Sequence, residues 1–316
     1  MASAFKSALV TGGAGFIGSH LVDALASAGS RVTVLDNLST GSLANLEAAA
    51  GRVRFVQADI RNRAAVEEAV SGCEVVFHLA AVVSVQKTVE DPLGSAAVNE
   101  MGSLSLLEAA RAAGVRRVVF ASSSAVYGDD PRLPKREDHA VRPRSPYAVQ
   151  KLAAEHYLSV YEGLFGLSTA SLRFFNVFGP RQDPSSPYSG VISIFLTRAL
   201  ADEAPLVYGD GGQTRDFIYV ADVVEALVRA SRSTEVGVFN VGTGREVDIL
   251  TLWREIAALT GCGRSPRHLP PRPGDIRRSV AAIDEAAGRL GFVPRVPFEE
   301  GLSRTLAWYR RAPAGS

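Results

Sequence analysis

The segment 11–18, TGGAGFIG, decides the fold, because it joins an apolar run at 6–11 to a helical run at 16–28. The first run predicts a β-strand and the second an α-helix. Glycines between them allow a tight turn and let the backbone approach a pyrophosphate, toward which the helix N-terminus points free N–H groups. The spacing G-x-x-G-x-x-G is one residue longer than the common dinucleotide fingerprint. An ordinary turn is the alternative, and the position between a clear strand and a clear helix favours a dinucleotide site.

Short β-rich runs alternate with longer helical runs through the first half of the chain. The expected strands are 6–11, 31–36, 53–59, 74–78, 116–121 and 168–174, and the expected helices are 16–28, 62–70, 92–113 and 146–165. The strands are continuous Val, Leu and Phe runs, which is typical of parallel strands buried on both faces. This order predicts an α/β fold, a Rossmann-type doubly wound parallel sheet with right-handed crossovers.

The regular alternation ends near residue 176. A loop rich in Pro, Ser and Gly follows at 176–190, and a Pro-rich loop covers 268–275. Shorter elements lie between and beyond them, with helices near 191–201, 221–231, 249–259 and 298–310 and strands near 206–208 and 216–220. We therefore expect a dinucleotide-binding domain over 1–175 and a smaller α/β substrate lobe over 176–316, with a boundary that can interleave.

The composition excludes several classes of protein. The chain has 316 residues, 47% of them hydrophobic, and 34 basic against 33 acidic residues, for a net charge of +1. The hydrophobic content of 47% excludes a disordered chain, and the near-zero net charge excludes a nucleic-acid binder. The two cysteines build no disulfide framework, the five histidines show no metal spacing, and no apolar run is long enough for a membrane helix. We expect a cytoplasmic protein that binds no metal, nucleic acid or membrane.

Two aspartates end predicted strands beside the glycine-rich loop. Asp36 ends the second strand, where a carboxylate can hydrogen-bond both ribose hydroxyls of an adenosine and would repel the 2′-phosphate of NADP. This position favours NAD over NADP and opposes a net NADP-dependent reductase. The alternative interpretation of Asp36 is a solvated loop aspartate. Asp59, at the end of the third strand, is a candidate for the adenine site, with an ordinary surface residue as the alternative.

A tyrosine and a lysine share a face of the predicted helix 146–165. Tyr147 and Lys151 are four residues apart, and an ammonium near a phenol lowers the phenol's pKa from about 10. A tyrosine tuned in this way, with the added charge of NAD⁺, can act as a base near neutral pH. Two amphipathic residues on a helix surface are the alternative. A serine run at 122–124, after the strand 116–121, supplies a hydroxyl at the carboxyl edge of the sheet, where ligands bind.

Taken together, these motifs resemble a known family. TGGAGFIG (11–18), HLAA (78–81), SSSAVYG (122–128), SPYAVQK (145–151) and RFFNVFGP (173–180) are similar to the extended short-chain dehydrogenases/reductases, most of all the UDP-hexose 4-epimerases. The resemblance continues through GDGGQTRDFIYVAD (209–222), FNVGTG (239–244) and PPRPGD (270–275), so it covers nearly the whole chain. It implies a UDP-sugar substrate, a bound NAD, and an inversion at C4 through a transient 4-keto sugar.

The resemblance also implies roles by position. Tyr147 is the base at the sugar 4-hydroxyl, Ser123 shares its proton network, and Lys151 holds the nicotinamide ribose. The implied NAD contacts are Gly12, Gly15, Phe16, Ile17, Gly18, Asp36, Asn37, Ser39, Thr40, Gly41, Asp59, Ile60, Leu79, Ala80, Ala81, Asn99, Tyr147 and Lys151. The implied substrate contacts are Ser84, Ser123, Asn176, Val191, Arg215, Arg272, Asp275 and Ser279. Arg181 and Arg277 are expected to add positive charge near the diphosphate.

The resemblance separates the reactions of the family. Related dehydratases and decarboxylases carry an acid just after the serine position, where this chain has Ser124 and Ala125, so simple epimerisation is favoured. Glucuronate epimerases usually carry Thr where this chain has Asn176, which makes them a weaker reading. Ser279 takes the position that gates the sugar pocket, where a small residue leaves room for a 2-acetamido group and tyrosine does not. The loop 179–191 also resembles the branch that handles N-acetylated sugars.

The expected activity is therefore interconversion of UDP-GlcNAc and UDP-GalNAc, with UDP-Glc and UDP-Gal as further substrates. One alternative is a UDP-glucose 4-epimerase proper, and Ser279 is then an ordinary loop serine. A non-catalytic NAD-binding sensor is the alternative from another class, and it would be expected to lose Tyr147 or Lys151. The helices 92–113 and 146–165 resemble those that form a four-helix dimer interface in the family, so a homodimer is expected.

Overall fold

The structure is a computed structural model that describes residues 5–183, 190–271 and 276–311. Seven strands form one sheet in the order β11-β6-β5-β4-β1-β2-β3. Every neighbouring pair is parallel. The strands are β1 Ser7–Thr11, β2 Arg31–Asp36, β3 Val53–Gln57, β4 Val75–His78, β5 Arg117–Ser123, β6 Ser168–Phe174 and β11 Gly237–Val241. The strand order reverses between β1 and β4, which is where doubly wound sheets bind ligands.

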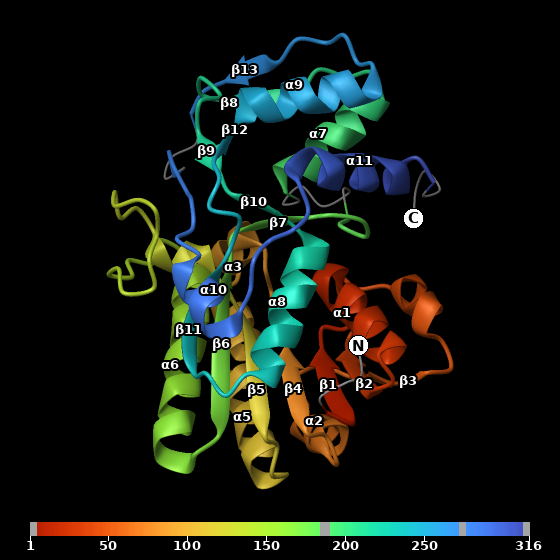
Figure 1. Ribbon diagram of the computed structural model, residues 1–316, viewed down its shortest axis with the longest axis vertical. Helices are drawn as coiled ribbons and strands as arrows, with labels where there is room; N and C mark the ends of the chain where they lie inside the picture. Colours follow the sequence, from red (N-terminus) through yellow and green to blue (C-terminus); the bar gives the residue numbers. More distant parts are fainter. Residues whose placement is uncertain (1–4, 184–189, 272–275, 312–316) are drawn as a thin grey trace.

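Helices cover both faces of this sheet (Figure 1). On one face lie α1 Phe16–Ser27, α8 Val220–Arg232 and α10 Asp284–Leu290, and on the other α2 Arg63–Val70, α5 Gly102–Ala112 and α6 Pro146–Phe165. Each face has its own apolar core, in which strand side chains pack against one helix layer. The predicted α/β fold with a doubly wound parallel sheet is confirmed.

The helix that carries Tyr147 and Lys151 has clear start and stop signals. Ser145 caps α6 by accepting a 3.2 Å hydrogen bond from the N–H of Ala148, and Pro146 occupies the first turn. The helix ends at Gly166, whose φ of +67° is left-handed. The predicted helix 92–113 is a succession of α4 Pro92–Ala96, a π-helical turn η2 at Ala97–Met101, and α5. The π turn contains Asn99, and such turns are frequent at functional sites.

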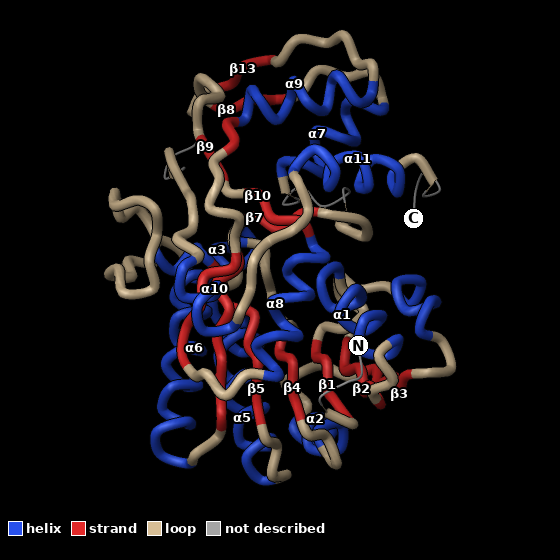
Figure 2. The backbone as a smooth tube through the Cα atoms, in the orientation of Figure 1, coloured by secondary structure: helices blue, strands red, loops and turns tan. Residues whose placement is uncertain are grey.

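The second lobe lies above the sheet in Figures 1 and 2. It holds α7 Val191–Leu200, α9 Ile249–Thr260 and α11 Phe298–Tyr309 around an apolar core. Three short strand pairs join it: β7 Asn176–Phe178 with β10 Phe217–Tyr219, β9 Thr214–Arg215 with β12 Val247–Asp248, and β8 Leu206–Tyr208 with β13 Arg267–Leu269. None of the helices in the described part of the chain is long and apolar enough to cross a membrane.

The chain also returns to the first sheet after residue 176. Strand β11 extends the sheet beside β6, and α8 packs on the same face as α1. The sequence did not predict β11, because the stretch around it is recognisable as a loop motif more readily than as a strand. Four short helical segments were also not predicted: η1 Leu43–Ala49, α3 Val85–Glu90, η3 Ser124–Tyr127 and α10.

Candidate active site

The glycine-rich loop is shaped for close backbone contact. Gly12 has a φ of +69°, and a Cβ there would lie 2.8 Å from the backbone nitrogen of Ala80. A Cβ at Gly18 would clash with the carbonyl oxygen of Gly12. Phe16 and Ile17 begin α1 directly after Gly15 and pack partly against the second lobe's core. The loop therefore leaves the α1 N-terminus uncovered by side chains at Gly12, Gly15 and Gly18, as a pyrophosphate site requires.

Asp36 lies at the carboxyl end of β2, next to this loop. Its carboxylate is buried and accepts hydrogen bonds from the N–H groups of Ala14 (2.9 Å) and Leu38 (2.8 Å). Each oxygen keeps a lone pair, because a carboxylate accepts about four hydrogen bonds. Gly41 packs against the Ala14 backbone, so a Cβ there would lie 2.9 Å from the Ala14 carbonyl carbon. The residues at this strand end fit the adenosine ribose of NAD.

The candidates for the adenine site are also brought together. Asn37 donates a 2.8 Å hydrogen bond to the Asp59 carboxylate and accepts one from the Ser39 N–H at 3.0 Å. Arg61 binds Asp59 through its side chain and backbone N–H, and this pairing lowers the pKa of Asp59 to about 2. Thr40 is exposed beside them. Asp59 is therefore an ionised acceptor that is largely used by the protein itself.

The segment 79–81, which follows β4, is held in place by the side chain of Thr11 at the end of β1. The Thr11 hydroxyl accepts hydrogen bonds from the N–H groups of Leu79 and Ala80, both at 3.2 Å, and lies 2.8 Å from the His78 Nδ1. Burial lowers the pKa of His78 to about 3, so this ring is neutral.

Asn99 and Ile60 complete the set of predicted NAD contacts. Asn99 accepts a hydrogen bond from the Val82 N–H at 2.8 Å and donates to the Val82 carbonyl and to Gln150 on α6. Ile60 is packed in the apolar core. Asn99 therefore ties the 79–82 loop to α6, the helix that carries Lys151.

A cavity of about 240 Å³ opens at the carboxyl ends of β5 and β6. Ser123 and Tyr147 line it, together with Asn176, Arg215 and Ser279 from the second half of the chain. The Ser123 hydroxyl lies near the Tyr147 phenol and lowers its pKa. The structure thus brings a strand-end serine, the helical tyrosine and three predicted substrate residues to one cavity.

Lys151 lies just below this cavity and is almost fully buried. Its ammonium nitrogen donates a 2.8 Å hydrogen bond to the Ala121 carbonyl and lies 4.7 Å from the centre of the Phe120 ring. Burial lowers the pKa of Lys151 to about 7, and the charge of Glu155 opposes this shift. Glu155 is itself held by Ser122 and by a paired Arg173, whose two nitrogens lie 2.9 and 2.7 Å from its oxygens.

The expected effect of Lys151 on Tyr147 is not found in the protein alone. Burial raises the pKa of Tyr147, and the nearby Ser123 hydroxyl is the opposing influence. The expectation considered only the charge of Lys151, whereas here that charge is weakened by its own burial. The structure therefore does not support a Tyr147 pKa that is lowered by Lys151 alone.

Some of the predicted substrate residues line the cavity, and others do not. Asn176 begins β7, Arg215 donates a 2.7 Å hydrogen bond to the Ile276 carbonyl, and Ser279 is buried on the cavity wall. Ser84 instead caps α3 by accepting from the Lys87 N–H at 3.1 Å, and Val191 begins α7; neither lines the cavity. Arg272 and Asp275 lie outside the described residues.

Asp216 fixes the wall that carries Ser279. Its carboxylate is fully buried and accepts hydrogen bonds from the Thr243 N–H (2.8 Å) and hydroxyl (2.6 Å) and from the Gly244 N–H (2.9 Å). A fourth hydrogen bond comes from the Ala281 N–H at 3.1 Å. Asp216, which directly precedes β10, therefore links this strand to the segment that carries Ser279 and Ala281.

The two arginines expected to add positive charge near the diphosphate each form an ion pair within the protein. Arg181 forms an ion pair with Asp23 on α1 at 2.7 Å, and Arg277 is paired with Asp210 at 2.6 Å. Both guanidinium groups thus have carboxylate partners that lie far away along the chain. Of the arginines expected at this site, Arg215 is the one on the cavity wall within the described part of the chain.

Sequence reasoning missed several lining residues. Lys135, Tyr127 and Phe175 line the cavity, as do Val85 and Ile276. Lys135 reaches it because it pairs with Ala281 in an isolated parallel bridge, a contact between distant segments that no local pattern reveals. Tyr127 lies in the SSSAVYG motif, so this motif was the available signal for it.

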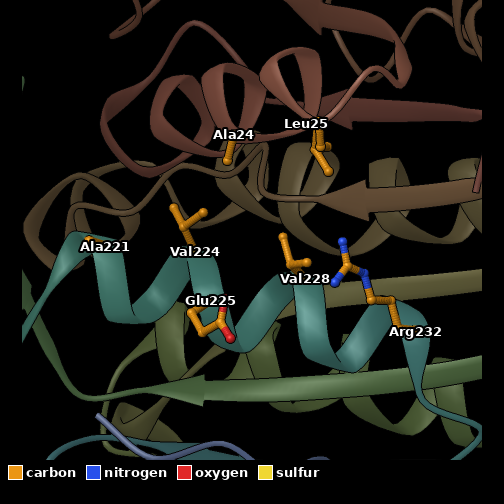
Figure 3. Close-up of a pocket in the computed structure, with 8 residues that line it drawn as sticks. Ala24, Leu25, Ala221, Val224, Glu225, Val228 and Arg232 are labelled. Atoms are coloured by element: carbon orange, nitrogen blue, oxygen red, sulfur yellow. The ribbon is translucent and has the colours of Figure 1, made fainter. Parts of the chain in front are cut away.

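A second cavity lies between α1 and α8 (Figure 3). Ala24 and Leu25 from α1 face Val224, Val228 and Arg232 from α8 across it. None of the predicted site residues lines this cavity. Within the described residues, no group of three His, Cys, Asp or Glu side chains is arranged to hold a metal ion.

Comparisons with known proteins agree with this geometry. The model of the NAD dependent epimerase/dehydratase family matches residues 8–242. UDP-glucose 4-epimerase of Mycolicibacterium smegmatis is 45% identical over 312 residues, covering 96% of this chain and 98% of that protein. The structure is similar to UDP-N-acetylglucosamine 4-epimerase from Methanobrevibacter ruminantium in complex with UDP-N-acetylmuramic acid, with a TM-score of 0.94, 40% identity, and 98% and 99% of the two chains covered. UDP-glucose 4-epimerase of Thermus thermophilus in complex with NAD gives a TM-score of 0.89 at 42% identity, covering 97% and 99%.

The chain therefore belongs to the NAD dependent epimerase/dehydratase family. The predicted family, the predicted NAD cofactor and the predicted class of enzyme, an epimerase, are confirmed.

Proposed function

We propose that this protein is a UDP-hexose 4-epimerase that accepts 2-acetamido sugars, interconverting UDP-GlcNAc and UDP-GalNAc. The observation that carries the proposal is the shared cavity of Ser123, Tyr147, Asn176, Arg215 and Ser279. A proton-transfer pair and a guanidinium for phosphate line the same space, as a nucleotide sugar requires. The similarity to epimerases of UDP-glucose and of UDP-N-acetylglucosamine supports both the substrate class and the reaction.

The cofactor site fits NAD. Gly12, Gly15 and Gly18 would hold the pyrophosphate, Asp36 the adenosine ribose, and Lys151 the nicotinamide ribose. NAD, when bound, supplies reversible oxidation of the sugar at C4. The charge of Asp36 opposes a 2′-phosphate at this position, which favours NAD over NADP.

Tyr147 moves the proton in this proposal. Its phenol oxygen takes the proton from the sugar 4-hydroxyl and returns it when the alcohol is restored. The Ser123 hydroxyl, which lines the same cavity as Tyr147 and lowers its pKa, holds the 4-oxygen in the same proton network. The Lys151 nitrogen lies 5.9 Å from the ring centre, and its protonated form places positive charge beneath the phenol.

The cavity wall favours epimerisation over elimination of water. Elimination needs a general acid beside the sugar. The described residues that line the cavity include no Asp or Glu, and Ser124 and Ala125 occupy the positions after Ser123. The wall therefore supplies no carboxylic acid for a dehydratase reaction from this part of the chain.

Ser279 supports the acetamido specificity. It lies on the cavity wall with a small side chain, and the segment that carries it is anchored by Asp216 through Ala281. A tyrosine at this position would fill space that a 2-acetamido group needs. A UDP-glucose 4-epimerase proper remains the second candidate, since relatives with that activity cover nearly the whole chain.

The test is product analysis after separate incubation with UDP-GlcNAc, UDP-Glc and UDP-GlcA. We expect conversion of UDP-GlcNAc to UDP-GalNAc by the wild-type protein and loss of about 10² to 10⁴ in rate for Tyr147→Phe. Ser279→Tyr should reduce turnover of the acetylated pair far more than that of UDP-Glc. Unchanged turnover of UDP-GlcNAc by Ser279→Tyr contradicts the gate, and conversion of UDP-Glc alone favours the second candidate.

We further propose a division of labour and an assembly. The seven-strand sheet with its helices binds NAD, and the remainder of 176–316 binds the nucleotide sugar, so the proposed boundary at 176 is crossed by β11, α8 and α10. A homodimer through α5 and α6 is supported by exposed apolar side chains on these helices. They are Met101, which adjoins α5, and Val149, Val160, Leu164 and Phe165.

A further inference from the structure

One cation of the catalytic cavity has no part in the chemistry proposed above. Lys135 lines the cavity together with Ser123, Tyr147 and Ser279, and only 2% of the residue is exposed. Its ammonium donates to the carbonyl oxygen of Asp130. The described residues provide no carboxylate that forms an ion pair with it, because the Asp130 side chain is bound by Arg132 at 2.7 Å.

This arrangement leaves donors without acceptors. An ammonium carries three N–H donors, and the described contacts of Lys135 use one of them. Burial lowers the pKa of Lys135, and the charges of Asp130 and Asp129 oppose this shift only in part. An acceptor oxygen that arrives from the cavity would satisfy a free donor and stabilise the charge.

The backbone places Lys135 beside the proposed gate. The Lys135 N–H donates to the Val280 carbonyl and the Ala282 N–H donates to the Lys135 carbonyl, both at 2.8 Å. This parallel bridge sets Lys135 opposite Ala281. Paired residues on adjacent strands point to the same face, and so do residues two apart in an extended segment. Lys135 and Ser279 accordingly both line the cavity.

The position also limits which part of the substrate Lys135 can meet. In the proposed function the sugar C4 lies at Tyr147 and Ser123, and the diphosphate lies at Arg215. The wall of Lys135 and Ser279 therefore faces substituents of the hexose ring other than the reacting hydroxyl. A carbonyl or carboxylate oxygen carries more negative charge than a hydroxyl oxygen and only accepts, so it is the stronger partner for a buried ammonium.

We propose that Lys135 is a substrate-binding residue that donates to a carbonyl-type oxygen on a ring substituent of the hexose. The acetamido carbonyl and a sugar carboxylate share this chemistry. The inference rests on the proposed function, because it takes the orientation of the sugar from it. In this proposal the small side chain of Ser279 leaves space for the ring substituent, and Lys135 provides the hydrogen bond that increases affinity for it.

The test measures binding to the NAD-loaded protein in the Tyr147→Phe background, where turnover does not disturb the equilibrium. Dissociation constants are measured by calorimetry for UDP-Glc, UDP-GlcNAc and UDP-GlcA, with Lys135→Met as the variant. Lys6→Met is the matched control, because Lys6 is exposed next to the start of β1 and lines neither cavity described above. We expect Lys135→Met to raise the Kd ratio of UDP-GlcNAc or UDP-GlcA to UDP-Glc by about tenfold or more, and Lys6→Met to leave it unchanged.

A second variant, Lys135→Gln, distinguishes the acetamido oxygen from the carboxylate oxygen. It also keeps the proposal testable if Lys135→Met does not fold. Lys135→Gln keeps an N–H donor and loses the charge, so it should retain most affinity for the acetamido sugar but not for the uronate. Equal changes for all three sugars, or no change in either variant, would overturn the proposal. Turnover by the protein with Tyr147 intact is assayed in parallel. If binding is selective but no sugar is epimerised, the proposed function fails while the role of Lys135 stands.

Discussion

The Lys151 ammonium nitrogen lies 5.9 Å from the centre of the Tyr147 ring, while it donates a 2.8 Å hydrogen bond to the carbonyl of Ala121. The lysine is therefore anchored to strand β5, which also ends in Ser123. One helix and one strand thus fix all three groups of the proposed proton pathway. In this arrangement Lys151 is almost completely shielded from solvent, and this burial lowers its pKa to about 7.

The first prediction concerns the pH dependence of stability. The folded pKa of Lys151 is about 7, below the ordinary value of about 10.4 that an unfolded chain has. Between these values the unfolded state binds one more proton, so stability should rise with pH through this window, by up to about 1.4 kcal/mol per pH unit from this group. Chemical unfolding of the NAD-free protein between pH 7 and pH 9 measures the slope.

The control for this measurement is Lys151→Met, which has no charge to bury. Its free energy of unfolding should rise less steeply over the same pH range than that of the wild type. Parallel curves for the two proteins would show that Lys151 is not desolvated as the structure has it.

Asp36 gives the second prediction. Asp36→Asn should lower the affinity for NAD by about tenfold or more, because a charge-assisted hydrogen bond to the ribose is lost. The same change should weaken discrimination against NADP, since the repelling charge is gone. Asp138→Asn is the matched control, because that carboxylate is exposed and belongs to none of the proposed NAD or substrate contacts. Calorimetric titration with both dinucleotides tests this, and an unaltered NADP to NAD ratio in Asp36→Asn would count against the ribose contact.

The sequence predicts the part of the fold and site that depends on local patterns. The glycine-rich loop, Asp36 and the pair of Tyr147 and Lys151 follow from strand ends and helical spacing, and the structure places them as expected. Strand β11 and Lys135 depend on pairing with segments far away in the chain, which local patterns do not encode. The pKa of Tyr147 depends on how deeply it is buried, and spacing along a helix carries no such information.

Asp216 gives the third prediction, which links stability to the sugar pocket. Asp216→Asn replaces a carboxylate that accepts four hydrogen bonds by an amide with one acceptor oxygen. We expect a loss of about 2–4 kcal/mol in the free energy of unfolding and a higher KM for the UDP-sugar, because the Ser279 segment loses its anchor. Asp210→Asn, with an exposed carboxylate, should change stability by less than about 0.5 kcal/mol. A normal KM in a destabilised Asp216→Asn protein would separate this anchor from the pocket.

The last prediction tests the proposed homodimer. Val160 and Leu164 lie one turn apart on α6, and 48% and 73% of these residues are exposed in the single chain. Side chains of this size stabilise an interface by about 1.5–3 kcal/mol each when they are buried, and a carboxylate in their place would have to be desolvated. The double variant Val160→Glu, Leu164→Glu should therefore sediment as a monomer at concentrations where the wild type is a dimer. Val293→Glu is the matched control, because Val293 is 55% exposed but lies outside α5 and α6, and this variant should remain dimeric. A double variant that stays dimeric would place the interface elsewhere, and a monomeric wild type would remove the homodimer from the proposal.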